Sequence, residues 1–179
     1  MNFQTIETTR LQLKGLSPND MKYIFNNLAK PEIKKILGHR SEEDYLKEET
    51  KHKNGYSSYN RSFILFLLTD KESGQIIGRC GLHNWNIEHK RAEIGYVMGD
   101  EHFKRKGLMT EAVNAILEYG FNVMKLNRIE ALVGIENVAS LKLMKKNNFV
   151  KEGILRQHFQ VSDRFEDSVI FSKLYNELP

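Results

Sequence analysis

Residues 92–112 read AEIGYVMGDEHFKRKGLMTEA, and three different patterns follow one another in this stretch. The apolar positions from Ala92 to Met98 predict a short strand. From Leu108 to Met124, apolar residues recur at helical spacing, which predicts a long amphipathic helix. Between them lies a polar loop that ends in basic residues and Gly107. The stretch therefore predicts a strand, a basic glycine-containing loop and the start of a helix.

The loop before this helix has the composition of an anion-binding site. Backbone N–H groups at a helix start lack intrahelical partners and carry partial positive charge. Lys104, Arg105 and Lys106 raise the local potential, and Gly107 allows a ligand to approach the backbone. The loop lacks the Gly-Lys-Ser/Thr ending of a Walker A motif and does not have the three glycines of the dinucleotide fingerprint. The pattern indicates a phosphate or pyrophosphate site, with an ordinary solvated turn as the alternative.

Outward from this stretch, predicted strands and helices alternate. Arg10 to Leu16 predicts a strand, and Ser17 and Pro18 predict the start of a helix. Ser41, with Asp44 three residues later, predicts a second helix that is mostly charged and solvated. We further predict strands at 62–69, 75–85 and 128–134, a short helix at 138–146 and two closing strands. No linker or repeat interrupts this order, so residues 1–179 are expected to form a single domain of the α/β (α+β) class around a mixed sheet.

Composition limits the partners. The 27 Lys and Arg residues exceed the 23 Asp and Glu residues only slightly and form short clusters, so no nucleic-acid partner is expected. A single cysteine, Cys80, excludes an internal disulfide and a cysteine-built zinc site, and we expect it to be a buried core thiol. No signal-peptide pattern is visible, and the apolar run from Phe63 to Leu68 is too short to span a bilayer. We expect a cytoplasmic location, no membrane partner and no metal.

A second motif lies at residues 137–149. Asn137 has the position and chemistry of a helix N-cap. Asn148 suits a C-terminal turn that requires left-handed backbone geometry. Leu141, Met144 and Phe149 are expected to be core residues.

In this order and at this spacing, the two motifs resemble those of the GNAT N-acetyltransferases. The loop at 104–110 is similar to that family's pyrophosphate loop, Gln/Arg-x-x-Gly-x-Gly/Ala, and residues 137–149 resemble its Asn-x-x-Ser/Ala helix with a Lys-x-Gly-Phe-type turn. The opening Thr8-Thr9-Arg10-Leu11-Gln12-Leu13 and the phrase Ala92-Glu93-Ile94-Gly95-Tyr96 resemble the RimJ/RimL branch, named for N-terminal acetylation of ribosomal proteins. The resemblance extends from about Thr8 to the final strands. It implies a mostly antiparallel central sheet flanked by helices.

The sequence departs from the family pattern at several positions. Lys104 replaces Gln or Arg, and Met109 replaces the second Gly/Ala. Asn148 replaces the turn glycine, which left-handed geometry permits. Met144 stands where many relatives carry a tyrosine proposed as general acid, so the proton donor is open.

The resemblance implies acetyl-CoA as co-substrate and assigns residues to it. The pantetheine arm is expected along Tyr96, Val97 and Met98, with Asn137 bonded to it and Ser140 near the sulfur. The pyrophosphate is expected on the backbone amides of Lys104, Arg105, Lys106, Gly107, Leu108, Met109 and Thr110.

Catalysis requires a base for the amine and a proton donor for the thiolate. Glu93 is the candidate base, because an acid between apolar strand neighbours is costly unless it faces a cavity. A solvent-facing residue or a structural ion pair is the alternative. Ser140 is the candidate proton donor, against a simple role in the helix start. Two histidines, His83 and His158, are further candidate bases. The candidates for lining the acceptor pocket are Trp85, Tyr96 and Phe159.

The predicted function is transfer of an acetyl group from acetyl-CoA to a primary amine, on a protein N-terminus or a small molecule, in a ternary complex. A non-catalytic coenzyme A-binding sensor is the alternative. An RNA-associated protein is a third hypothesis, against which the lack of a basic stripe argues. The final strand pair could support a homodimer. Residues 33–59 are expected to shape the acceptor site, but they show no pattern that identifies the acceptor.

Overall fold

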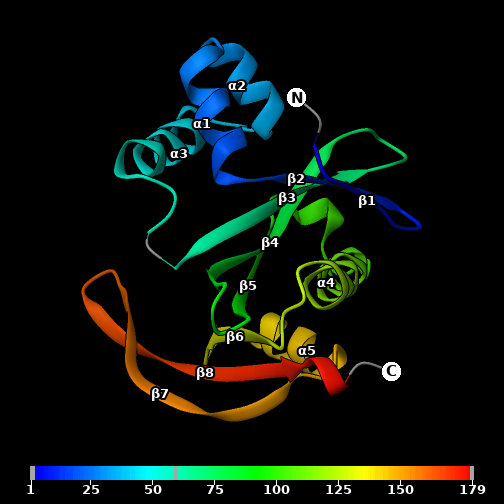
Figure 1. Ribbon diagram of the computed structural model, residues 1–179, viewed down its shortest axis with the longest axis vertical. Coiled ribbons are helices and arrows are strands. Elements are labelled where there is room, and N and C mark those ends of the chain that lie inside the picture. Colours follow the sequence, from blue (N-terminus) through cyan, green and yellow to red (C-terminus); the bar gives the residue numbers. More distant parts are fainter. Residues whose placement is uncertain (1–2, 59, 178–179) are drawn as a thin grey trace.

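The computed structural model describes residues 3–58 and 60–177, which form an eight-stranded sheet in the order β1-β2-β3-β4-β5-β6-β8-β7 (Figure 1). Neighbouring strands are antiparallel except for β5 and β6, which run parallel. This confirms the mixed, mostly antiparallel sheet. The strands are β1 (Thr5–Glu7), β2 (Leu11–Leu16), β3 (Ser62–Asp70), β4 (Ile76–Asn86), β5 (Arg91–Met98), β6 (Arg128–Gly134), β7 (Val150–Val161) and β8 (Arg164–Leu174). The helices are α1 (Pro18–Asn27), α2 (Lys30–Leu37), α3 (Glu42–Asn54), α4 (Leu108–Glu118) and α5 (Val138–Lys146), with short turns η1 (Glu101–Phe103), η2 (Tyr119–Val123) and η3 (Tyr175–Glu177).

Local capping signals set the helix starts. Ser17 accepts a hydrogen bond from the backbone N–H of Asp20, and the Asp20 carboxylate accepts one from the backbone N–H of Ser17, which fixes the start of α1. Ser41 and Asp44 repeat this arrangement at α3. Helix α2 was not predicted, because it is short and buries only Ile33 and Leu37.

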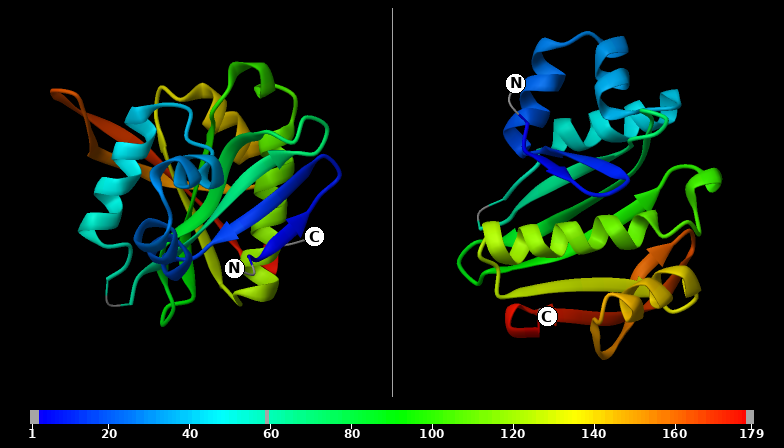
Figure 2. Two further views of the ribbon diagram at one scale, coloured as in Figure 1. Left: turned by 90° about the horizontal axis from the view of Figure 1, so that it is seen from above. Right: turned by 90° about the vertical axis from the view of Figure 1, so that its right-hand side faces the viewer.

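Helices cover both faces of the sheet (Figures 1 and 2). In β3, Phe66 and Leu68 belong to the core shared with α4 and α5, whereas Leu67 packs with α1, α2 and α3. This alternation follows from the two-residue period of a strand. Cys80 is buried in the first of these cores, and burial raises the pKa of its thiol to about 12, so it is the expected core thiol.

The parallel strands β5 and β6 diverge soon after they meet. They pair only where Arg91, Ala92 and Glu93 lie beside Arg128, Ile129 and Glu130. Beyond this point β6 continues along β8, and β5 continues along β4. Within residues 3–58 and 60–177, the backbone edge of β5 at 94–98 therefore has no strand partner on the β6 side.

The helix after the basic loop is shorter than predicted. It was expected to reach Met124, but α4 ends at Glu118 and continues as the π-helical turn η2, in which Met124 N donates to Tyr119 O (3.1 Å). Gly120 lies in this turn, and an added Cβ there would come within 2.8 Å of Ile129 Cδ1. Close contact with β6 thus accompanies the change in helix type.

An ion-pair cluster joins β6, β7 and β8. Glu152 accepts hydrogen bonds from Arg128 and, at 2.7 Å, from Ser172. The Arg128 hydrogen bonds, followed by that of Ser172, lower the pKa of Glu152 to about 2.

Glu152→Gln is therefore expected to destabilise the fold at neutral pH but not in strong acid. A lowered pKa in the folded state stabilises above the unfolded value, and this contribution disappears as pH falls toward about 2. We expect a melting temperature lower by about 2–4 °C at pH 7, with the difference vanishing near the folded pKa. Thermal scans from pH 7 downward measure it, with Glu43→Gln as an exposed control. A deficit that stays constant with pH would contradict the prediction.

Candidate active site

Three cavities meet at Tyr96 on β5. The largest, of about 840 Å³, lies between the end of β5, the loop before α4, and α5; we call it the α5 cavity. A second, of about 490 Å³, lies between α3, β3, β4 and β5; we call it the α3 cavity. A small junction cavity of about 190 Å³ occupies the divergence of β5 and β6. Tyr96 lines all three and Val97 lines the two large ones, so these two cavities come together at β5.

The α5 cavity gathers nearly all the residues that the sequence assigned to the coenzyme. Of that set, the lining contains Tyr96, Val97, Met98, Lys104, Arg105, Gly107, Leu108, Met109, Thr110, Asn137 and Ser140. Lys106 is the exception, because its ammonium group lies over the ring of Phe103 and its carbonyl accepts a hydrogen bond from Arg10.

The loop entering α4 is shaped by two residues with left-handed backbone. Arg105 has φ 60° and Gly107, the N-cap of α4, has φ 79°. Glycine adopts this geometry without strain, whereas an arginine does so at some cost, a pattern common at functional sites. No side chain caps α4. Its first-turn N–H groups are therefore available to an anion.

The opening residues of the chain hold this loop in place. Glu111, in the first turn of α4, accepts hydrogen bonds from Thr8 Oγ1 (2.7 Å), Arg10 N (2.8 Å) and Arg10 Nε (2.8 Å). Arg10 also donates to the carbonyl of Lys106 at 2.9 Å. We call Thr8, Arg10 and Glu111 the N-terminal clamp. Contacts spanning about a hundred residues of sequence thus fix the loop against β2.

Asn137 and Ser140 lie where α5 meets the α5 cavity. Asn137 Oδ1 accepts a hydrogen bond from Ser140 N (3.1 Å), as expected for an N-cap, which leaves Nδ2 outside the cap. The Ser140 side chain lies beside the hydroxyl of Tyr96. Burial raises the pKa of Tyr96, and the hydrogen bond with Ser140 partly offsets the increase. Met144 is fully buried in the core, so the tyrosine beside Ser140 comes from β5 and not from the Met144 position.

His83 and Glu93, two separate candidates in the sequence, form a pair. They are directly opposite in the β4–β5 register, and Glu93 Oε1 lies 3.2 Å from His83 Nε2. Asn84 Nδ2 donates to Glu93 Oε2 at 2.9 Å. Burial acts to raise the pKa of Glu93, but the His83 and Asn84 hydrogen bonds outweigh it, so the pKa lies below its ordinary value. Glu93 lines the junction cavity, and His83 lines both that cavity and the α3 cavity.

The remaining sequence candidates lie elsewhere. His158 Nδ1 is 3.3 Å from Ser168 Oγ, and its ring packs against Phe159. Neither residue lines any of the three cavities, and Trp85 packs against the core.

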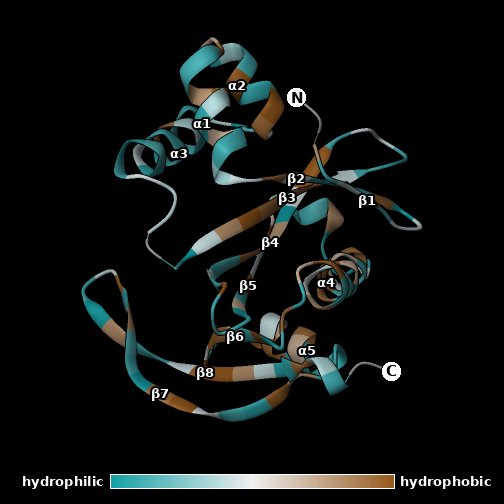
Figure 3. Ribbon diagram, viewed as in Figure 1, coloured by the Kyte–Doolittle hydropathy of each residue, from teal (hydrophilic) through white to brown (hydrophobic). Residues whose placement is uncertain are grey.

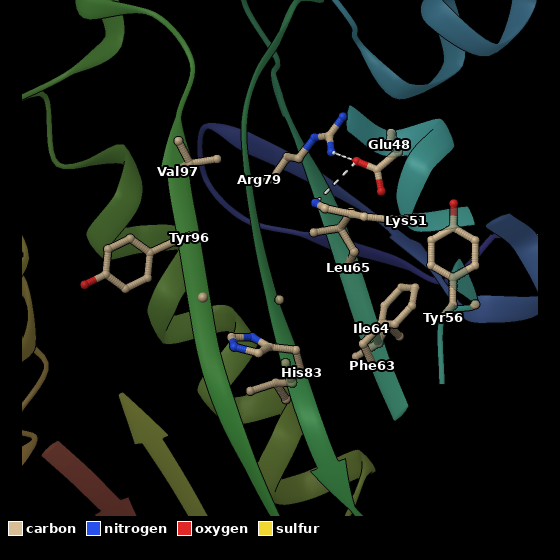
Figure 4. Close-up of a pocket in the computed structure, with 14 residues that line it drawn as sticks. Glu48, Lys51, Tyr56, Phe63, Ile64, Leu65, Arg79, His83, Tyr96 and Val97 are labelled. Carbon is tan, nitrogen blue, oxygen red and sulfur yellow. Dashed lines mark hydrogen bonds and ion pairs between the residues drawn. The ribbon is translucent and has the colours of Figure 1, made fainter. Parts of the chain in front are cut away.

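The α3 cavity contains residues that the sequence did not single out (Figure 4). Glu48 of α3 is 6% exposed and forms a 2.8 Å ion pair with Arg79 of β4, while Lys51 Nζ lies 3.9 Å from the same carboxylate oxygen. Arg79 also donates to the carbonyl of Leu37 at 3.0 Å. The helix predicted to be mostly solvated thus turns a buried acid toward the sheet. No periodicity could reveal this, because the partner is distant in sequence.

Tyr56 lines the same cavity. Burial raises the pKa of its hydroxyl, and this buried oxygen has no hydrogen-bond partner within residues 3–58 and 60–177. The region expected to shape an acceptor site therefore supplies Glu48, Lys51 and Tyr56 to a cavity. Its last residue, Tyr59, lies outside the described residues.

Two negative findings apply to the described part of the chain. It contains no group of three or more His, Cys, Asp or Glu residues arranged to hold a metal ion. It also contains no helix with the length and apolar character needed to cross a membrane.

Comparisons with known proteins agree with this geometry. The acetyltransferase (GNAT) domain family matches residues 10–150. The uncharacterized N-acetyltransferase p20 of Bacillus licheniformis is 34% identical over 97% of this chain and 98% of its own. A spermidine N(1)-acetyltransferase of Vibrio cholerae is 27% identical over 89% of this chain and 90% of its own. In fold, the ribosomal-protein-S5-alanine acetyltransferase of Vibrio fischeri aligns with a TM-score of 0.69 at 23% identity, covering 98% of this chain and 99% of that one. The chain belongs to the GNAT family and is an acetyltransferase enzyme.

Proposed function

We propose that this enzyme transfers the acetyl group of acetyl-CoA directly to a primary amine, within a ternary complex. One observation carries the proposal: two large cavities lie on either side of β5 and meet at Tyr96. The α5 cavity receives the coenzyme, and the α3 cavity receives the amine. We also propose that all of residues 1–179 form one domain, because β8 and β7, beyond the matched residues, extend the sheet from β6.

The residues of the α5 cavity fit coenzyme A. The uncapped first turn of α4 and the side chains of Lys104 and Arg105 would hold the pyrophosphate. The unpaired edge of β5 at 94–98 offers backbone hydrogen bonds to the pantetheine amides, and Asn137 Nδ2 offers another. The coenzyme supplies an activated acetyl thioester.

On the acceptor side, we propose that His83 acts as the general base that removes the proton from the amine. Glu93 is held ionised by its lowered pKa and is thereby a weak base near neutral pH. It accepts a hydrogen bond from His83 Nε2, which favours the neutral tautomer whose Nδ1 can take a proton. Glu93 thus completes the catalytic pair by orienting the imidazole and stabilising its charged form.

On the coenzyme side, the hydroxyl groups of Tyr96 and Ser140 are placed to donate hydrogen bonds to the sulfur of the coenzyme. Their hydroxyl groups lie together where the cavities meet, and either can donate a hydrogen bond to a thiolate. A backbone N–H of Val97 or Met98 can donate to the carbonyl oxygen as its negative charge develops.

A thiol-release assay with acetyl-CoA tests the proposal. The panel contains peptide N-termini, amino acids, polyamines and aminoglycosides, and mass spectrometry identifies the acetylated product. We expect release with one class of primary amine. Failure of every amine to release thiol, together with failure of acetyl-CoA to bind in calorimetry, would overturn the assignment.

Two observations bear on the kind of amine that accepts the acetyl group. The V. cholerae relative is named for spermidine, a small-molecule amine. The opening Thr8-Thr9-Arg10-Leu11 resembles the RimJ/RimL branch and favours a protein N-terminus. We propose a primary amine of one of these two kinds.

The N-terminal clamp is expected to control coenzyme affinity. Glu111→Gln removes the charge that holds Arg10, so the loop loses its fixed position. We expect the KM for acetyl-CoA to rise about tenfold, the equivalent of ~1.4 kcal/mol, with little change in kcat. Steady-state kinetics measure this, and Glu118→Gln, at an exposed position of the same helix, is the control. An unchanged KM would show that the clamp is only structural.

We propose that the β7–β8 hairpin supports a homodimer. Ile154, Phe159 and Phe165 are 53%, 45% and 62% exposed, and apolar segments follow the hairpin in Figure 3. Sedimentation of the wild type and of Phe165→Asp tests this. We expect a dimer that the substitution weakens, and a monomeric wild type at micromolar concentration would contradict it.

A further inference from the structure

We infer that the acceptor amine carries a carboxylate, which Lys51 and Tyr56 bind at the α3 end of the α3 cavity. The inference rests on the proposed function, because it assigns the α3 cavity to the acceptor. It selects short peptides and amino acids whose amine and carboxylate are separated by an apolar chain over polyamines.

The charges around this cavity favour an anion. Apart from His83 and two tyrosines, its ionisable lining residues are one carboxylate, Glu48, and two cations, Lys51 and Arg79. Arg79 is paired with Glu48 at 2.8 Å and is further fixed by the carbonyl of Leu37. Lys51 is 3.9 Å from the same Glu48 oxygen, so one positive charge exceeds what Glu48 neutralises. A polyamine would add positive charge to a cavity that already has a positive excess.

The Tyr56 hydroxyl supplies a second reason. It is buried, and within the described residues it has no hydrogen-bond partner. Buried polar groups in folded proteins nearly always have one, so a partner is expected from a water molecule or a bound ligand. A carboxylate only accepts hydrogen bonds and can take the hydroxyl proton, whereas an ammonium group only donates.

The positions of the lining residues indicate how the acceptor is oriented in the cavity. Figure 4 shows Lys51 and Tyr56 at the α3 side of the cavity and His83 on β4, beside β5. The apolar residues Phe63 and Ile64 also line it. An acceptor with its amine toward His83 and its carboxylate toward Lys51 therefore has an apolar body between the two groups.

Matched acceptor pairs test the inference. We compare 6-aminohexanoate with 6-aminohexanamide, and alanyl-phenylalanine with its C-terminal amide, and include spermidine. The acid and the amide of each pair differ only in the carboxylate, and spermidine has no carboxylate. We expect kcat/KM for each carboxylate to exceed that of its amide at least tenfold, and calorimetry in the presence of coenzyme A to show the same order of affinity. Spermidine is expected to be a poor acceptor.

Substitutions test whether Lys51 and Tyr56 cause the preference for a carboxylate. Lys51→Gln and Tyr56→Phe are each expected to reduce the carboxylate-to-amide ratio several-fold. Lys47→Gln, one turn earlier on α3 and paired with Glu43, is expected to leave the ratio unchanged. Circular dichroism and melting temperature confirm that each variant is folded.

Two outcomes would overturn the inference. An amide or spermidine used as well as the carboxylates would show that no anion is recognised. A carboxylate preference that survives both variants would place the recognition elsewhere. In either case, if acetyl-CoA binds and an amine is acetylated, the proposed function stands and this inference alone fails, whereas loss of coenzyme binding overturns both.

Discussion

Replacing His83 with alanine is expected to lower kcat for acetyl transfer by roughly 10²–10⁴-fold, the usual contribution of a positioned general base. His83 lines the α3 cavity, and Glu93 holds its Nε2 at 3.2 Å, so the substitution removes the proton acceptor but leaves the α5 cavity intact. The KM for acetyl-CoA is therefore expected to change little. Steady-state kinetics with saturating amine separate the two parameters.

Matched variants make the His83 result interpretable. His89→Ala, at an exposed turn position, is expected to be fully active. Glu93→Gln keeps the size of the side chain but cannot stabilise a charged imidazole, and we expect an intermediate loss of kcat. If Glu93→Gln proved far more damaging than His83→Ala, the carboxylate itself would be the base.

Gly95→Ala is expected to lower kcat by about 100-fold without unfolding the protein. An added Cβ at this position would lie 2.9 Å from His83 Cε1 and 3.1 Å from His83 Nδ1. The imidazole is a side chain at the cavity surface and can rotate away, so stability changes little. A displacement of about 1 Å in a catalytic group can cost about 10²-fold.

Gly153→Ala is the control for this second substitution. Gly153 is also a strand glycine, but it lines none of the three cavities, and an added Cβ there meets only Ile170 Cγ2, at 4.0 Å. It should retain wild-type kcat and melting temperature. Full activity of Gly95→Ala would show that the position of the His83 ring does not limit the reaction.

Elements with local signals were predictable from the sequence. Helix α5 runs over Val138–Lys146 as predicted, because Asn137 caps its start and Asn148 takes the left-handed geometry at its end. The start of α1 at Pro18 followed in the same way from Ser17 and Asp20. The order of the other strands and helices also followed from local patterns, but β1 and α2 were not predicted.

Features that depend on pairing between distant segments were not predictable. The divergence of β5 and β6 is a property of strand pairing, since β6 pairs with β8 along its whole length but with β5 only at Arg128, Ile129 and Glu130, and no local pattern encodes this. His83 and Glu93 were each candidates, but their contact follows from the β4–β5 register. Glu48 and Tyr56 were missed because they come close to Arg79 only after α3 packs on the sheet. Glu48 then forms an ion pair with Arg79, and the charge of Arg79 acts on Tyr56.

A crystal structure of the protein with coenzyme A tests the central claim most directly. The account predicts the pyrophosphate at the start of α4, the pantetheine arm along the free edge of β5 at 94–98, and the sulfur beside Tyr96 and Ser140. The α3 cavity should be open to a second molecule. Coenzyme bound in the α3 cavity, or away from β5 altogether, would contradict the account.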